Sequence, residues 1–211
     1  MSRAALDRLQ ERFPEAVLAT HDFRGDETAV VAGSALRELC RFLRDEPTLA
    51  FDMLTDATAV DYLLEPGRTA PRFEVVYHLY SVSRKVRLRL KVQVPEADLE
   101  VDSLCELWPI ANWLEREIWD MYGIRFRGHP DPRRLLLYEE FVGHPLRKDY
   151  PKEKRQPLVR RPEPEIAEVL ARRGRARPLL GDASTWSGAA EDARRSGEAA
   201  ATNSSRPRGE E

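Results

Sequence analysis

Two neighbouring segments, residues 73–79 and 86–94, alternate between apolar and more polar side chains with a period of two. In an extended strand, such a period places every second side chain on the same face. Residues 83–85 lie between the two segments, so we predict a long antiparallel hairpin with one apolar face. The opposite face of the second strand is basic, which predicts exposure to solvent or contact with an acidic partner; it carries Arg87, Arg89 and Lys91.

Shorter patterns before this hairpin predict both helices and strands. Residues 3–12 and 34–43 place leucines at helical spacing, and Ser34 stands where an N-cap is expected. Gly25-Asp26 lies between two short apolar runs, which predicts a second hairpin. The strands expected in this part of the chain are residues 15–20, 28–32 and 48–54.

A third helix is predicted at residues 109–121, with Pro109 in its first turn and Gly123 as its C-terminal cap. Ser103 and Glu106 have the spacing of a capping box just before it. Its apolar stripe consists of Leu107, Ala111, Leu114, Ile118 and Met121. The order of elements predicts an α+β fold: a two-layer domain with one mixed or antiparallel sheet and helices packed on it.

Charge and proline content divide the chain further. The formal net charge of -2 is the sum of three unlike parts. Residues 1–151 carry a net charge of about -5, residues 152–178 about +5, and the remaining residues are weakly acidic. After residue 124 the chain is rich in proline and has little periodicity, which is typical of an extended segment. We expect an α+β domain at residues 1–124 and a long extended C-terminal arm that binds a partner at residues 125–165. Residues 166–211 form a charged tail rich in Ala, Gly, Ser and Arg, which we expect to be largely disordered.

The composition argues against several classes of protein. Charges that nearly balance do not suit a globally basic nucleic-acid binder. The sequence contains neither an apolar run of about 18 residues nor a signal-peptide pattern, and we expect a reducing, cytosolic environment. Cys40 and Cys105 stand alone, unlike the cysteines of a disulfide scaffold, a zinc finger or a self-contained iron–sulfur site. Without a Gly-x-Gly-x-x-Gly or Walker motif, no nucleotide site is assigned.

Acidic residues gather on the third predicted helix. Glu115, Glu117 and Asp120 could form a general acid–base set. Because no activated nucleophile accompanies them, we favour an exposed or interface face on which they pair with Arg116 and nearby bases. Trp113 lies off the apolar stripe, so it is either a partial core residue or an interface anchor.

The tripeptide Gly-His-Pro occurs twice, at residues 128–130 and 143–145. Glycine permits an unusual backbone angle, and proline forces the histidine before it into an extended conformation. Two imidazoles are too few for a metal site. We therefore expect His129 and His144 each to anchor a turn through hydrogen bonds.

These residues resemble the signature of the 30-kDa (C) subunit family of respiratory complex I, the proton-pumping NADH:quinone oxidoreductase. The signature positions are filled by Glu115, Arg116, Glu117, Asp120, Met121, Tyr122, His129, Arg133 and Leu135. The Gly-His-Pro-Leu-Arg-Lys-Asp-Tyr-Pro run at residues 143–151 also matches, and the resemblance extends over residues 5–160.

The resemblance implies a structural subunit of the peripheral arm that braces the quinone-reducing module and has no active site of its own. NADH, FMN, iron–sulfur clusters and quinone would belong to the assembled complex, and no cofactor or metal to this chain. The implied partners are other hydrophilic subunits, chiefly the large quinone-site subunit. The resemblance also implies a location on the cytoplasmic face of a bacterial inner membrane, which the chain would contact only through the complex. Interface residues would include Arg147, Lys148 and Asp149, with Arg147 paired to a carboxylate of the large subunit.

Two alternatives stay open. Equivalent subunits occur in related membrane-bound hydrogenases and in other quinone-reducing dehydrogenases, and this chain alone does not separate them. The basic stretch 152–178 would suit a module that binds nucleic acid or an anionic membrane. That stretch lacks interleaved aromatic residues and includes the helix-breaking Pro157, Pro162 and Pro164, so no nucleic-acid partner is expected.

Overall fold

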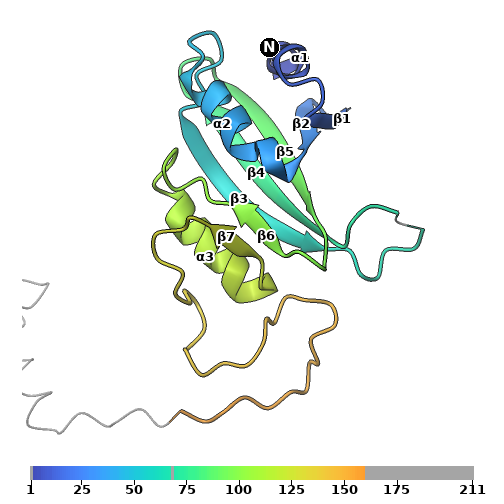
Figure 1. Ribbon diagram of the computed structural model, residues 1–211, viewed down its shortest axis with the longest axis vertical. Coiled ribbons are helices and arrows are strands. Elements are labelled where there is room, and N and C mark those ends of the chain that lie inside the picture. Colours follow the sequence, from blue (N-terminus) through green and yellow to red (C-terminus); the bar gives the residue numbers. More distant parts are fainter. Residues whose placement is uncertain (1, 68, 160–211) are drawn as a thin grey trace, which may run out of the picture. The chain divides into compact units, whose positions relative to one another are not determined.

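A mixed five-stranded sheet forms the centre of the fold (Figure 1). The computed structural model describes residues 2–67 and 69–159. The strand order is β1-β2-β5-β4-β3, and every neighbouring pair is antiparallel except β2 and β5. The strands are β1 (Val17–Phe23), β2 (Asp26–Val31), β3 (Met53–Asp61), β4 (Phe73–Ser81) and β5 (Val86–Val94).

The long hairpin predicted from the period of two is confirmed as β4 and β5. Tyr77 pairs with Leu90 in a register that runs unbroken over the whole length of both strands. The apolar face is buried, as expected. The opposite face is occupied by ion pairs between strands, since Lys91 Nζ lies 2.8 Å from Glu74 Oε1 and Arg89 lies 3.4 Å from Asp26 on β2.

Helices α1 (Ser2–Arg12) and α2 (Leu36–Asp45) contribute their leucines to one apolar core with the sheet. Helix α1 contacts β2 and β5, and α2 lies across the sheet (Figure 1). The predicted spacing is confirmed because Leu36, Leu39, Cys40 and Leu43 are all buried. Together these elements confirm the α+β fold with one mixed sheet.

Two local predictions in this region are wrong. Residues 48 and 49 belong to a turn and residues 50–52 have no regular structure, so β3 begins only at Met53. Ala50 has a φ of 47°, and its N–H donates to Glu46 O, which is incompatible with an extended chain. Leu49 and Phe51 are nevertheless buried, so their alternation reflects packing of a turn. Ser34 lies inside a short 3-10 helix, η1 (Gly33–Ala35), and caps no helix.

The third helix, α3 (Ala111–Tyr122), packs against β3. It connects two short parallel strands that no sequence pattern predicted, β6 (Glu100–Asp102) and β7 (Arg125–Arg127). Gly123 ends the helix as predicted, with a φ of 82° and its N–H donating to Trp119 O. A β-carbon at this position would lie 2.7 Å from the ring of His144, so only glycine fits here.

After β7 the chain contains no helix or strand up to residue 158, and this segment, residues 128–158, is called the arm below. The arm lies beside α3 (Figure 1). The predicted tail at 166–211, the end of the predicted arm and most of the basic stretch 152–178 lie outside the described residues. No helix among the residues that the structure describes is long and apolar enough to cross a membrane.

Candidate functional site

The carboxylate of Asp120 anchors the arm to helix α3. This side chain is fully buried, and its Oδ2 accepts the backbone N–H groups of Leu135, Leu136 and Leu137 at 3.2, 2.9 and 2.9 Å. Arg134 Nη1 donates to Oδ1 at 2.5 Å. Burial would raise the pKa of Asp120, but these four donors outweigh it and hold the pKa below its ordinary value. A single carboxylate thus binds the backbone of three consecutive residues and the side chain of the residue before them.

Arg134 and His144 extend this anchor. Arg134 also donates to Phe141 O at 2.9 Å, and its guanidinium stacks on the ring of Trp119. His144 Nδ1 is hydrogen-bonded to Asp120 O at 3.0 Å, and Leu146 N–H donates to Met121 O. The arm therefore folds back onto the C-terminal end of α3.

Glu115 orders the chain on the N-terminal side of the helix. Its side chain is fully buried; Oε1 accepts Leu104 N–H at 2.7 Å and Oε2 accepts the hydroxyl of Ser103 at 2.6 Å. Burial raises the pKa of Glu115 above its ordinary value. The predicted capping box is wrong, because no helix begins at Ser103 and Glu106 pairs with Arg37 instead.

The expectation of an exposed acidic face on α3 is also wrong. Glu115 and Asp120 are fully buried, and only Glu117 of the three is exposed. The arrangement gives no acid–base pair facing a shared reaction site. Each of the two buried carboxylates instead holds an irregular segment of chain.

Replacing Glu115 with glutamine tests this assignment through pH. Because the pKa of Glu115 is higher in the folded protein than in the unfolded chain, the protonated side chain stabilises the fold below pH 4.5, its ordinary pKa. This stabilisation is lost as the pH rises through the raised pKa. Glutamine keeps polar atoms near Leu104 N and Ser103 Oγ but does not titrate. We expect the difference in melting temperature between Glu115→Gln and the parent to shift in favour of Glu115→Gln as the pH rises above about 4.5. Thermal unfolding of both proteins across this range, with Glu117→Gln as the exposed control, measures the effect; parallel curves would contradict it.

The basic members of the signature have unequal roles. Arg116 is largely buried and donates to the carbonyl oxygens of Arg133 and Arg134 at 2.9 and 2.8 Å. The side chain of Arg133 is 73% exposed and pairs only with Asp131 among the described residues. His129 accepts Asp131 N–H at Nδ1 and bonds Asn112 O through Nε2. The predicted turn-anchoring hydrogen bonds of both histidines are thus present.

Cys105, Glu115 and His129 bring three donor atoms within 4.8 Å of one another. No sequence motif indicated this cluster, because Cys105 and His129 lie on different segments. Both nitrogens of His129 already bond backbone groups, and Nδ1 accepts an N–H, so the proton of the neutral ring is on Nε2. Burial raises the pKa of Cys105 to about 11. We therefore assign no metal to these residues.

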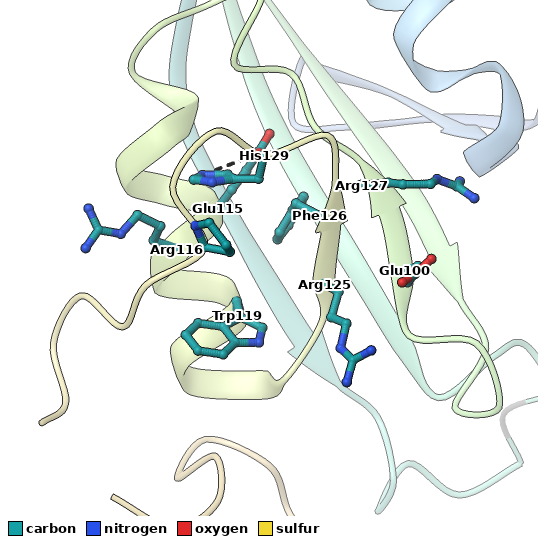
Figure 2. Close-up of a pocket in the computed structure, with 9 residues that line it drawn as sticks. Glu100, Glu115, Arg116, Trp119, Arg125, Phe126, Arg127 and His129 are labelled. Atoms are coloured by element: carbon teal, nitrogen blue, oxygen red, sulfur yellow. Dashed lines mark ion pairs between the residues drawn. The ribbon is translucent and has the colours of Figure 1, made fainter. Parts of the chain in front are cut away.

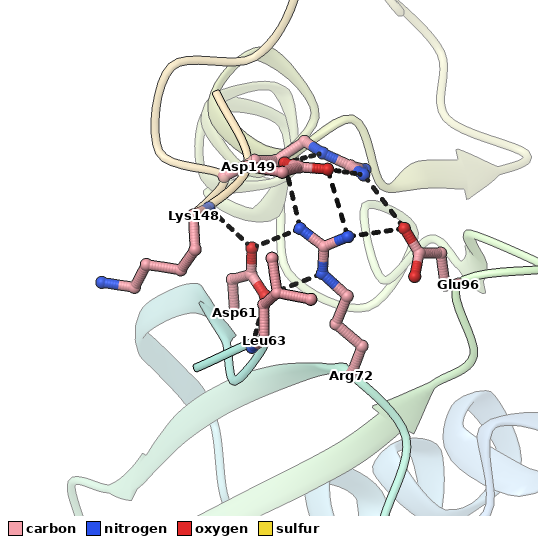
Figure 3. Close-up of polar contacts among 7 residues, drawn as sticks. Asp61, Leu63, Arg72, Glu96, Lys148 and Asp149 are labelled. Carbon is pink, nitrogen blue, oxygen red and sulfur yellow. Dashed lines mark hydrogen bonds and ion pairs between the residues drawn. The ribbon is translucent and has the colours of Figure 1, made fainter. Parts of the chain in front are cut away.

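A second anchor joins the tip of the arm to the edge of the sheet (Figure 3). Arg72 binds the fully buried carboxylate of Asp61 through two hydrogen bonds of 2.9 and 2.8 Å. Asp61 also accepts the backbone N–H of Lys148 at 2.8 Å, and Asp149 lies 3.0 Å from Arg72. Sequence reasoning missed Asp61 and Arg72, which flank the β3–β4 connection and belong to no motif.

Arg147 belongs to this same anchor. Its guanidinium pairs with Asp149 at 3.0 Å and with Glu96 at 3.3 Å, and it stacks on the ring of Phe73. Both carboxylates come from this chain, whereas the sequence led us to expect a carboxylate of another subunit. Hydrogen bonds from Arg147 and Arg72 lower the pKa of Asp149. The Lys148 side chain is exposed and points away from the cluster (Figure 3).

The sequence pattern of the family described as "Respiratory-chain NADH dehydrogenase, 30 Kd subunit" matches residues 29–156. This range contains both anchors and every signature residue. The chain belongs to this family. Similar relatives include the C subunit of NADH-quinone oxidoreductase from Geobacter sulfurreducens, which is 49% identical over 147 residues, or 70% of this chain and 88% of the relative. The protein of the same name from Roseiflexus castenholzii is 50% identical over 146 residues, or 69% and 82%.

Two solved structures share the fold of this 30-kDa subunit family member. A trypsin-resistant fragment (1-134) of Nqo5 is 32% identical, covers 60% of this chain and 98% of its own, and has a TM-score of 0.53. A chain of the membrane-bound sulfane sulfur reductase, an archaeal respiratory membrane complex, is 19% identical, covers 86% and 96%, and has a TM-score of 0.55. At this identity the second likeness concerns the fold alone.

Proposed function

We propose that this chain is the 30-kDa (C) subunit of a proton-translocating NADH:quinone oxidoreductase and that it braces the quinone-reducing module without holding a redox group. The chain is a part of an enzyme whose active sites lie in other subunits. Its partners are hydrophilic subunits of the peripheral arm, chiefly the large quinone-site subunit. The assembly lies on the cytoplasmic face of a bacterial inner membrane, which this chain touches only through the complex.

The observation that carries this proposal is an irregular arm held rigidly by buried carboxylates while it exposes apolar side chains. Leu136 and Val142 of the arm are 62% and 52% exposed, although the backbone around Leu136 is fixed by Asp120. Trp113 on α3 is also 57% exposed, which favours its interpretation as an interface anchor. An already ordered apolar surface loses little entropy when a partner covers it.

The family match and the relatives' names favour an NADH-linked complex over the alternatives. The likeness to the sulfane sulfur reductase chain concerns the fold, so an equivalent place in another respiratory complex stays the second candidate. Genes next to this one that encode a flavin-binding NADH subunit would decide between them. The alternative of a nucleic-acid or membrane module depends on the stretch 152–178, most of which lies outside the described residues.

Deletion and complementation test the proposed function directly. We expect membranes from a strain without this chain to lose NADH:quinone reductase activity, because the quinone module is no longer braced. A tagged full-length chain should restore the activity and co-purify with quinone-module subunits under non-denaturing conditions. The purified chain alone should show no flavin or iron–sulfur absorbance. Unchanged activity on deletion, or a salt-sensitive DNA gel shift without co-purifying subunits, would contradict the proposal.

A further inference from the structure

A pocket lies between helix α3 and strand β7 (Figure 2). Its volume is about 280 Å³. Trp119 from α3, Phe126 from β7 and Pro132 from the arm provide apolar walls, while Glu115 and His129 close one end. Trp119 and Phe126 are partly exposed, although the Trp119 ring is also contacted by Arg134 and His144.

Charged side chains of both signs form the rim of the pocket. Three arginines line it, Arg116, Arg125 and Arg127, against one exposed carboxylate, Glu100. Arg116 is paired with Asp131 and Arg127 with Asp102. Arg125 is exposed and has no ion pair within 4.0 Å among the described residues, even though Glu100 is its partner in the strand register. The rim therefore offers an unpaired cation beside an apolar cavity.

The polar groups that face the cavity are already engaged within the chain. Glu115 accepts from Ser103 and Leu104, and both nitrogens of His129 bond backbone groups. Small-molecule sites usually measure about 300–1,000 Å³ and present free polar groups that orient the ligand. This pocket lies at the lower end of that range, and its inner polar atoms are already engaged, so they are not free to orient a ligand. An interface anchor, an aromatic or large aliphatic side chain inserted from a partner, requires only the apolar walls.

We propose that this pocket receives one aromatic or large aliphatic side chain from an acidic segment of another subunit, with a neighbouring carboxylate of that segment paired to Arg125. The inference rests on the proposed function, because it takes the occupant from the assembly to which the chain belongs. The unpaired guanidinium of Arg125 selects a carboxylate in that segment, and the size of the cavity limits the insertion to a single side chain. This docking surface is separate from the exposed apolar residues of the arm.

Charge reversal in the full-length tagged chain tests the proposal. Arg125→Glu places a second carboxylate beside Glu100 and repels the acidic segment. We expect it to lower recovery of partner subunits at raised salt at least about tenfold, whereas Arg125→Lys keeps recovery near that of the parent. Arg87→Glu, on an exposed arginine of β5 that does not line the pocket, is the matched control. Equal recovery with Arg125→Glu, or an equal loss with Arg87→Glu, would overturn the proposal.

A photo-crosslinking benzophenone amino acid in place of Arg127 provides a measurement that does not depend on Arg125. Irradiation of the assembled complex should link this position to an acidic segment of another subunit that carries an apolar residue. A link only to this chain's own residues, to a second copy, or to no protein would overturn the inference. If the parent chain recovers no subunits at all, the proposed function fails and the pocket assignment falls with it; a failure confined to position 125 or 127 leaves the proposed function standing.

Discussion

Replacing Asp120 with alanine will release the arm from helix α3 and lower the free energy of unfolding by about 3–5 kcal/mol. The substitution removes one acceptor from three backbone N–H groups and leaves Arg134, whose side chain is only 13% exposed, without its carboxylate. Breaking a buried ion pair on one side costs more than the pair contributes, because the remaining charge stays desolvated.

Urea unfolding measures this loss, and limited trypsin digestion locates it. Arg133 and Arg134 should become cleavable in Asp120→Ala before the body of the domain is cut. Glu117→Ala is the matched control, since Glu117 is an exposed acid on the same helix. A variant as stable and as protease-resistant as the Glu117→Ala protein would show that Asp120 does not hold the arm.

Replacing Arg72 with alanine is expected to cost a similar amount, about 3–5 kcal/mol, for the opposite reason. Here the orphaned charge is the fully buried carboxylate of Asp61, which loses both of its guanidinium hydrogen bonds. Burial would raise the pKa of Asp61, but Arg72 and two backbone N–H groups lower it below its ordinary value. The ionised Asp61 therefore stabilises the fold above pH 3.8, its ordinary pKa, and this stabilisation is lost as the pH falls through the lowered pKa of the folded protein.

Hydrogen exchange of the Lys148 amide reports on this anchor directly, because that N–H donates to Asp61. Its protection should fall in Arg72→Ala along with the midpoint of urea unfolding. Arg87→Ala removes an exposed arginine from the same sheet. It should change the free energies derived from exchange protection and from urea unfolding by no more than about 0.5 kcal/mol. A loss below about 1 kcal/mol in Arg72→Ala would contradict a buried, unpaired Asp61.

Local periodicity was sufficient to predict the body of the fold. The β4–β5 hairpin and the stripe on α3 follow from repeats of 2.0 and 3.6 residues, which depend only on neighbours along the chain. Burial of Glu115 also had a signal, since it stands four residues after Ala111 and three before Ile118, both buried on that stripe. The charge of Glu115 favours an exposed position and its place on the stripe favours a buried one, and the buried position is the one that the structure shows.

The anchors of the arm could not be predicted in this way. The donors to Asp120 lie 14 to 17 residues downstream, and the Lys148 donor to Asp61 lies 87 residues downstream. Nothing in the helical period at Asp120 indicates those donors. The role of such a polar side chain becomes visible only in the folded structure, because its burial depends on hydrogen bonds from backbone groups that are distant in the sequence.

The 87-residue separation between Asp61 and Lys148 has a consequence for protein synthesis. At about 5–20 residues per second, a ribosome adds that stretch in roughly 4–17 s. Throughout this interval the nascent sheet has an edge at which Asp61 has not yet received its last donor. The second anchor is therefore completed late in synthesis, and a chain cut short before Lys148 would present an incomplete surface to any assembling partner.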